Sequence, residues 1–174
     1  MNHRELARKI YTVSNIRGNF VLRSGKTSTE YFDKYLFESV PEILENIARE
    51  AITRIPKDID YIAGLELGGI PIATMISHYS RMPTLFIRKQ AKEYGTCKCA
   101  EGGEINGKRI LIIEDVVSTG GAIIDGVAML RKAGGIIQDV ICVIDRESGG
   151  KEKLKEHGLN LIGLFTKSEL ESAT

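Results

Sequence analysis

Tryptophan is absent from this chain of 174 residues, and it has no excess of charge of either sign. Lysine and arginine together number 24 and aspartate and glutamate 23, so the formal net charge is +1. A protein that coats nucleic acid or spreads over a membrane surface needs a larger excess of positive charge. We therefore expect no nucleic-acid or membrane partner, and any bound anion must be held by a local cluster of donors.

Cysteine is scarce and no long hydrophobic run occurs. Three cysteines, an odd number in a chain long enough to bury a core, favour a reducing compartment over a disulfide framework. Cys97 and Cys99 have no second Cys or His pair beside them, so incidental thiols are favoured over a zinc site, and Cys142 is expected in the core. No segment approaches the ~18 apolar residues of a membrane span, and the N-terminus lacks a signal-peptide stretch. We expect a cytoplasmic protein.

Short, unbroken apolar runs rich in β-branched residues are typical of strands buried on both faces. Four such runs occupy residues 61–65, 84–87, 110–113 and 140–144, with a weaker fifth at 161–165. Segments with helical spacing separate them, including the stripes Ile43, Ile47, Ala51, Ile55 and Ile123, Val127, Leu130. Pro71 suits the first turn of a further helix, and Gly134 and Gly135 end the helix before them.

The alternation of strand and helix from about residue 40 to 165 predicts an α/β fold, a parallel twisted sheet flanked by helices on both faces. Residues 1–38 do not follow this pattern, because one short amphipathic helix is followed there by an extended stretch rich in Gly, Ser and Tyr. We therefore expect a single domain over residues 1–174, with a small N-terminal hood at 1–38 and an α/β core at 39–174.

The segment after residues 110–113 has the composition of a ligand site. Ligands of open parallel sheets bind beyond the carboxyl ends of the strands. Here the acidic pair Glu114 and Asp115 is followed by hydroxyls and glycines where a helix begins. Free N–H groups and the helix dipole make such a turn an anion site, and Ser118 or Thr119 can cap the helix. The acids suit vicinal sugar hydroxyls, although a plain strand–turn–helix with an acidic cap has the same pattern.

This run resembles the phosphoribosyl pyrophosphate (PRPP) motif of the type I phosphoribosyltransferases, which has four apolar residues, two acids, two apolar residues, two small or hydroxyl residues and a glycine. The resemblance implies the fold of that family. It also implies that Glu114 and Asp115 hold the ribose hydroxyls of PRPP and that the following turn holds its 5′-phosphate. The implied PRPP-binding run is Glu114, Asp115, Val116, Val117, Ser118, Thr119, Gly120, Gly121 and Ala122.

Two other strand ends carry features that suit a pyrophosphate. Gly68 and Gly69 match the pyrophosphate loop of the family, although paired glycines also make ordinary tight turns. The basic segment after residues 84–87, in which Arg88, Lys89, Lys92 and Tyr94 stand, is similar to the catalytic loop of orotate phosphoribosyltransferases. There the loop closes over the pyrophosphate of a neighbouring subunit, which implies a homodimer. Tyr94 replaces the histidine of many members, and a solvated basic loop remains an alternative.

The last strand end and the hood carry features that suit the base. Arg146 follows residues 140–144 in an Asp–Arg pair, where arginine can bind a planar carboxylate with two hydrogen bonds. The resemblance to the orotate enzymes implies that Arg146 holds the carboxylate of orotate, with Ser118, Tyr31 and Phe32 also at the base, and that Arg23 contacts a phosphate of PRPP. A surface Arg–Glu pair, and core packing for Phe32, are the alternatives.

The resemblance implies that the chain transfers ribose 5-phosphate from PRPP to orotate, giving orotidine 5′-monophosphate and pyrophosphate in pyrimidine biosynthesis. Lys89, Lys92 and Asp115 are the implied catalytic residues. The implied cofactor is Mg²⁺, bound mainly through PRPP with no direct protein ligand. A phosphoribosyltransferase for a purine or uracil would leave the basic loop and the Asp–Arg pair unexplained, and a non-catalytic PRPP-sensing regulator would need a nucleic-acid-binding part.

Overall fold

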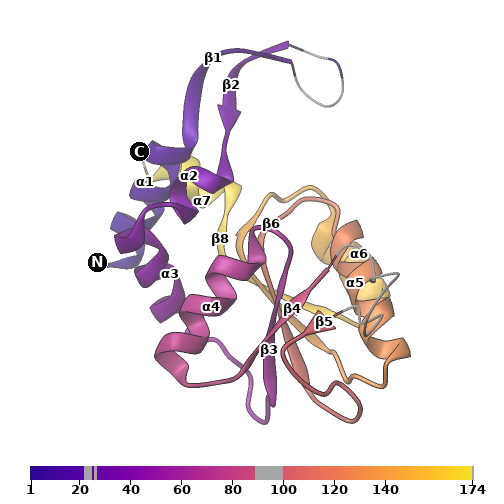
Figure 1. Cartoon of the computed structure of the whole chain (residues 1–174). Coiled ribbons are helices and arrows are strands. Elements are labelled where there is room, and N and C mark those ends of the chain that lie inside the picture. The colour runs from indigo at the N-terminus through magenta and orange to yellow at the C-terminus, as the bar shows by residue number, and fades with distance from the viewer. Residues whose placement is uncertain (22–24, 26, 89–99, 174) are drawn as a thin grey trace.

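A central sheet with helices on both faces forms the body of the protein (Figure 1). The structure is a computed structural model that describes residues 1–21, 25, 27–88 and 100–173. The 6-stranded sheet has the order β5-β4-β3-β6-β7-β8. All neighbours are parallel except β4 and β5, which are antiparallel. The strands are β3 (Tyr61–Leu65), β4 (Thr84–Ile87), β5 (Ala100–Glu101), β6 (Ile110–Val117), β7 (Asp139–Asp145) and β8 (Asn160–Thr166).

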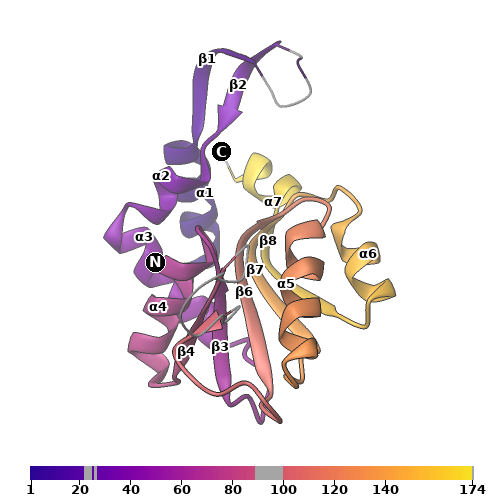
Figure 2. The same cartoon turned by 45° about the vertical axis from the view of Figure 1, so that its right-hand side comes forward.

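The helices divide between the two faces of the sheet (Figures 1 and 2). One group is α1 (His3–Ser14), α2 (Lys34–Glu38), α3 (Pro41–Ile52), α4 (Gly69–Ser80) and α7 (Lys167–Ser172), and the other is α5 (Gly121–Lys132) and α6 (Gly150–Glu156). The fold class predicted from the sequence is therefore confirmed. No helix within the described ranges is long and apolar enough to cross a bilayer.

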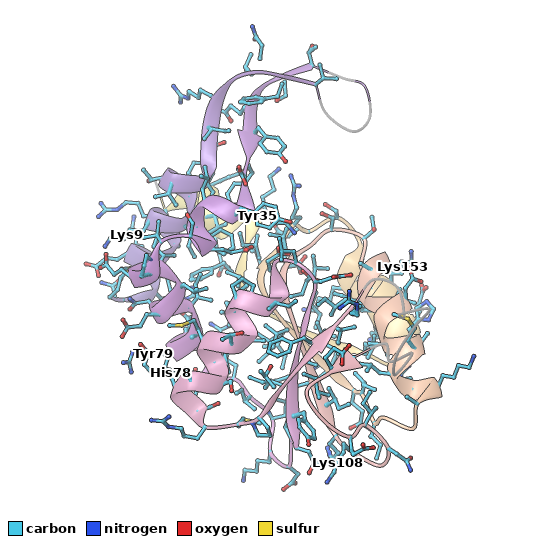
Figure 3. All side chains as sticks on the ribbon, viewed as in Figure 1. Lys9, Tyr35, His78, Tyr79, Lys108 and Lys153 are labelled. Atoms are coloured by element: carbon cyan, nitrogen blue, oxygen red, sulfur yellow. The ribbon has the colours of Figure 1, made fainter. Side chains whose placement is uncertain are left out.

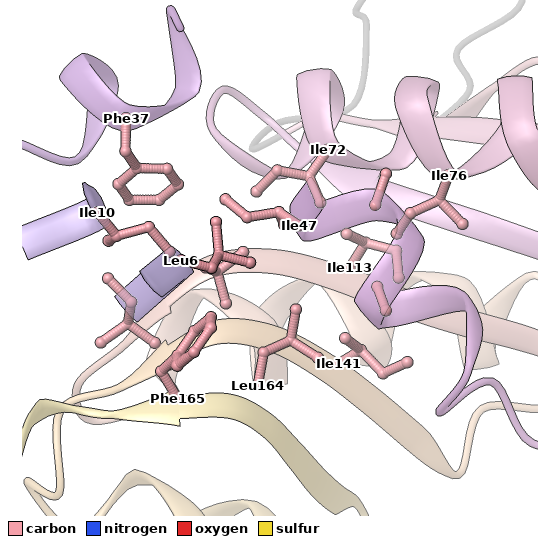
Figure 4. Packing of buried hydrophobic residues seen from close by; sticks show 14 of the residues in the cluster. Leu6, Ile10, Phe37, Ile47, Ile72, Ile76, Ile113, Ile141, Leu164 and Phe165 are labelled. Carbon is pink, nitrogen blue, oxygen red and sulfur yellow. The ribbon is translucent and has the colours of Figure 1, made fainter. Parts of the chain in front are cut away.

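Alternation along the buried strands supplies both cores. In β6, Leu111 and Ile113 belong to the cluster on the side of α1–α4, whereas Ile110 and Ile112 belong to the cluster on the side of α5. Successive side chains of a strand point to opposite faces of the sheet. Residues 110–113 are apolar at every position, so this part of β6 is buried on both faces. The α1–α4 cluster is shown in Figure 4, where Phe37 of α2 packs near Ile10 of α1.

The N-terminal segment forms a hairpin that projects from the body (Figures 1 and 2). Its strands are β1 (Asn15–Val21) and β2 (Thr27–Phe32), paired antiparallel. The expected first helix is present as α1, whose N-cap Asn2 forms a capping box with Glu5. The sequence did not indicate α2, which begins directly after β2 and buries Phe37 and Glu38.

Two local predictions need correction. The strand expected at 110–113 continues to Val117, because its backbone goes on pairing with β7 as far as Asp145. Glu114 and Asp115 therefore lie inside β6, not after it. Helix α5 is not capped by Ser118 or Thr119, since its N-cap is Gly120 in the left-handed conformation (φ 74°) without a side-chain cap. The strands at 61–65 and 84–87 have the predicted bounds.

Candidate active site

The carboxyl ends of β3, β6 and β7 meet at one edge of the sheet, below the hairpin (Figure 2). The loop with Gly68 follows β3, the turn with Ser118 follows β6, and Arg146 follows β7. A backbone hydrogen bond of 2.9 Å from Arg146 N–H to the Val117 carbonyl ties the last two ends together. The parallel sheet therefore gathers three of the predicted segments in one place.

Asp115 is the most buried polar group of this edge, with an exposed fraction of 0%. It has the same parity in β6 as Leu111 and Ile113, so its side chain points towards the face of α1–α4, where it meets α2. Its Oδ2 lies 2.5 Å from Nζ of Lys34, and its Oδ1 accepts a hydrogen bond of 2.5 Å from the backbone N–H of the next residue, Val116. The contact with Lys34 was not predicted from the sequence.

Three carboxyl groups and one ammonium group share this small volume. Burial, the charge of Asp115 and a hydrogen bond to it raise the pKa of Glu38 to about 8. Burial and the neighbouring Asp115 also raise the pKa of Glu114 well above its usual range. Burial alone would raise the pKa of Asp115, but hydrogen bonds with Glu114 and Lys34 and the lysine charge outweigh it and lower that pKa. At neutral pH, Asp115 therefore carries the negative charge and Glu38 a proton.

Gly68 and Gly69 pack directly on the acidic strand. A Cβ on Gly68 would overlap the carboxylate of Asp115 and lie 2.9 Å from Oε1 of Glu38. A Cβ on Gly69 would overlap the carbonyl oxygen of Ile113. The two glycines are therefore required by the close approach of the loop to β6, an internal reason that adds to their predicted role at a pyrophosphate.

The turn between β6 and α5 has the geometry of an anion site. Gly120 holds the left-handed conformation that glycine adopts without steric cost, and a Cβ on Gly121 would meet nothing within 4 Å. No described side chain caps the N-terminus of α5, so its first N–H groups and the helix dipole face the open side of the turn. Ser118 is half-buried, and Thr119 and Ala122 are exposed on this turn.

A cavity of about 300 Å³ lies between the hairpin and the ends of β6 and β7. It brings together Tyr31, Phe32 and Arg146, three of the residues predicted to hold the base. Ser118, also predicted there, does not line it. Its wall also includes residues that the sequence did not single out, namely Tyr11, Asn15, Ser28, Glu30, Ile144, Lys167, Leu170 and Glu171. Val116, which lines it too, was predicted among the PRPP-binding residues and not at the base.

Several predicted residues are placed differently or not at all. Arg88 is half-buried at the end of β4 and lines a separate cavity of about 210 Å³ with Glu66 and Asp125. Arg23, Lys89, Lys92 and Tyr94 lie outside the described residues, as do Cys97 and Cys99. Among the described residues, no group of three or more His, Cys, Asp or Glu side chains is arranged to hold a metal ion.

The fold and this edge define an α/β protein with a parallel sheet, in which an acidic pair lies beside an open helix N-terminus. Residues 31–160 match the family model described as the phosphoribosyl transferase domain. The chain belongs to the phosphoribosyltransferase family, as its central motif predicted.

Curated proteins with similar sequences share one name within this family. The orotate phosphoribosyltransferase of Nocardioides sp. is 49% identical over 168 residues, which cover 97% of this chain and 94% of that protein. That of Halobacterium salinarum is 43% identical over 156 residues, 90% of this chain and 89% of the relative. The resemblance to orotate phosphoribosyltransferases stated from the motifs is thereby confirmed.

Solved structures of orotate phosphoribosyltransferases have the same fold as this chain. The Mycobacterium tuberculosis orotate phosphoribosyltransferase in complex with Fe(III) dicitrate superposes with a TM-score of 0.84 at 29% identity, covering 97% of this chain and 98% of that one. The same enzyme in complex with PRPP gives a TM-score of 0.83 at 26% identity, with the same coverage of both chains.

Proposed function

We propose that this chain is an orotate phosphoribosyltransferase that transfers ribose 5-phosphate from PRPP to orotate, releasing pyrophosphate. The observation that carries the proposal is that an acidic pair, an open helix N-terminus and an arginine-lined cavity lie along one edge of the sheet. The relatives' shared name supports orotate as the acceptor. The product enters pyrimidine biosynthesis.

The donor would lie across the ends of β3 and β6. Its 5′-phosphate would accept hydrogen bonds from the N–H groups between Ser118 and Ala122, where a helix N-terminus favours negative charge. Its ribose hydroxyls would donate to the acidic pair. Glu114 is half-buried, and Asp115 is buried next to Lys34, which would hold its carboxylate at the ribose.

The acceptor would occupy the cavity under the hairpin. Arg146 is exposed on this cavity and can pair with a planar carboxylate through two hydrogen bonds, while Tyr31 and Phe32 supply aromatic surface. Ser118, in the neighbouring turn, is placed between the two substrates in this proposal. Orotate carries a carboxylate that uracil and the purine bases lack, so Arg146 is the proposed determinant of specificity.

The chemistry requires positioning and charge neutralisation. The ribose C1 passes through an oxocarbenium-like state, as in glycoside transfer, and the leaving group is already a stable polyanion. Aligning two bound reactants can lower the barrier by up to roughly 7–11 kcal/mol. We propose that Gly68, Gly69 and Arg88, with Arg23, Lys89, Lys92 and Tyr94, hold the pyrophosphate. Of these, Lys89 and Lys92 are the proposed catalytic cations.

Mg²⁺ is the proposed cofactor. Mg²⁺ sites at phosphates are usually completed by substrate oxygens and water, so we propose that the ion is held mainly through PRPP, with no direct protein ligand. When bound, the ion neutralises charge on the departing pyrophosphate.

A homodimer with the basic loop shared between subunits is part of the proposal. Mixing a Lys89→Ala variant with an Asp115→Asn variant then reconstitutes some complete sites, so activity should reappear in the mixture. Two inactive variants that stay inactive when mixed, although sedimentation shows them dimerised together, would contradict a shared site.

The function is tested by incubating the protein with PRPP, Mg²⁺ and a panel of bases, namely orotate, uracil, adenine, guanine and hypoxanthine. We expect orotate to be consumed, with one pyrophosphate released for each orotidine 5′-monophosphate formed. Consumption of another base with orotate untouched would refute the proposal.

A further inference from the structure

Helix α2 joins the hairpin to the acidic strand. It begins at Lys34, directly after β2, and its N-cap is Asp33, whose side chain accepts a hydrogen bond from Tyr35 N–H. Figure 3 shows Tyr35 at the base of the hairpin, above the sheet edge. Lys34 and Glu38 are four positions apart and so share one face of the helix. That face meets the end of β6 at Asp115.

Both side chains converge on one carboxylate. Lys34 Nζ lies 2.5 Å from Asp115 Oδ2, and Glu38 faces the same carboxylate, since both carboxyl groups lie next to the Cβ position of Gly68. Glu38 Oε1 is buried, and no donor among the described residues reaches it, so a proton held between Glu38 and Asp115 satisfies both groups. The Cβ position of Gly68 lies between these two carboxyl groups, and its vacancy gives them room to meet.

Stability alone does not account for this arrangement. Asp115 is fully buried and Lys34 is 34% exposed. A charge taken out of water loses so much hydration that apolar residues of similar size are often equally stabilising. Elsewhere α2 is stabilised by apolar burial, since Phe37 packs into the apolar cluster with Ile10. A charged cluster next to an apolar core is instead what a site uses to fix one carboxylate in one orientation.

We propose that Lys34 and Glu38 are positioning residues that fix the Asp115 carboxylate for the ribose of the donor. This inference rests on the proposed function. It also gives the hood a second role, because residues 31–38 then carry both the aromatic wall of the base cavity and the support of the ribose site. The two substrates would be coupled through one short segment.

The charges facing Glu38 give the cluster a pH dependence. They are Asp115 on β6 and Lys34 and Asp33 on α2 itself. Helices α1 and α3 pack on the other side of α2, around Phe37, with apolar side chains. With Glu38 protonated, the ammonium group of Lys34 balances Asp115. Ionisation of Glu38 leaves one extra negative charge beside a site for a polyanion, so donor affinity should fall as Glu38 loses its proton.

The first experiment compares Lys34→Met with a matched control, Lys9→Met. Lys9 also forms an ion pair, 2.8 Å from Glu42, but on the outer surface (Figure 3). We expect Lys34→Met to lower kcat/KM for PRPP by about 10- to 100-fold, the range that follows from a small misplacement at a site, with little change in KM for orotate. Lys34→Arg should recover part of the loss, and Lys9→Met should match the wild type.

A double-mutant cycle tests whether Lys34 acts through Asp115. If it does, adding Lys34→Met to Asp115→Asn should cause little further loss, because the carboxylate that it positions is already gone. Losses that multiply would show that Lys34 acts on the donor directly, and would overturn the inference. A loss of kcat/KM for both substrates in proportion to a reduced folded fraction would overturn it as well.

The pH profile tests Glu38. For the wild type, kcat/KM for PRPP should decline above about pH 8, where Glu38 ionises, whereas the profile of Glu38→Gln should lack that decline. Identical profiles would overturn the part assigned to Glu38. Glu42→Gln is the control on the surface of α3.

Failure of the inference can be told from failure of the proposed function. A wild type that does not convert orotate refutes the function, and the inference is then decided by calorimetric titration with PRPP and Mg²⁺. Weaker PRPP binding by Lys34→Met, but not by Lys9→Met, supports it, whereas equal binding or no binding by the wild type overturns it. An active wild type with an equally active Lys34→Met refutes the inference alone.

Discussion

Gly68→Ala is the sharpest test of how the loop after β3 and the acidic strand fit together. Gly68 has φ −67° and ψ −30°, a conformation that alanine adopts without strain. Any cost must therefore come from the added methyl group. That group would overlap the Asp115 carboxylate, whose Cγ would lie 2.5 Å away, and approach Glu38 Oε1 at 2.9 Å.

The magnitude follows from where the displaced group can go. Asp115 is fully buried and held by Lys34, Glu38 and the Val116 N–H, so the carboxylate cannot swing into solvent. Overpacking of this kind costs about 1–3 kcal/mol. For a chain of this length, 1 kcal/mol moves the melting temperature by about 2–4 °C, so we expect a decrease of about 2–12 °C. The displaced carboxylate should also lower kcat/KM for PRPP by about 10- to 100-fold.

Gly121→Ala is the matched control for stability. It also stands at the start of a helix with an ordinary φ, but its Cβ would meet nothing within 4 Å. Alanine there should stabilise the fold by about 0.4–1 kcal/mol, because it restricts the unfolded chain. Thermal unfolding followed by circular dichroism compares the two. A Gly68→Ala protein as stable as Gly121→Ala would refute the packing of Gly68 against Asp115.

Arg146→Ala should raise KM for orotate far more than KM for PRPP, since it removes the partner of the carboxylate, and steady-state kinetics in each substrate would show an equal rise if the assignment is wrong. Lys89→Ala should lower kcat by orders of magnitude with modest loss of PRPP affinity, and unchanged turnover would remove the loop from catalysis. Because the folded-state pKa of Glu38, about 8, exceeds the ordinary 4.5, the folded protein binds this proton more tightly, so its contribution to stability is present below pH 4.5 and is lost as the pH rises through 8. Urea unfolding at several pH values should show that decline for the wild type and a weaker one for Glu38→Gln, and equal slopes would contradict the raised pKa.

Much of the fold could be predicted because its information is local. Residues 61–65 and 84–87 are mostly apolar, and such a short run is typical of a strand covered on both faces. The end of β6 was missed because Glu114 and Asp115 look like the end of a buried segment. Backbone pairing with β7, a long-range property, keeps the strand going to Val117.

Part of the candidate site could also be predicted from the sequence, and part could not. Glu114, Asp115 and the glycine turn are consecutive, so their chemistry could be inferred together. Arg146 and Tyr31 lie in separate segments that only the family resemblance linked, and the structure shows that both line one cavity. Lys167 lines that cavity too, but it stands in a short C-terminal helix whose sequence resembles any exposed helix. Nothing local marks it as part of a wall.

The sequence by itself determined the alternation of strand and helix from about residue 40 to 165, the acidic and glycine-rich turn, and the family, because each depends on residues adjacent in the chain. Only the tertiary structure decided which charges meet. Lys34 and Asp115 are far apart in the sequence, and their contact depends on α2 docking over the end of β6. Burial then sets which carboxyl group is ionised, since the cost of a charge depends on its surroundings in space and not on its neighbours along the chain.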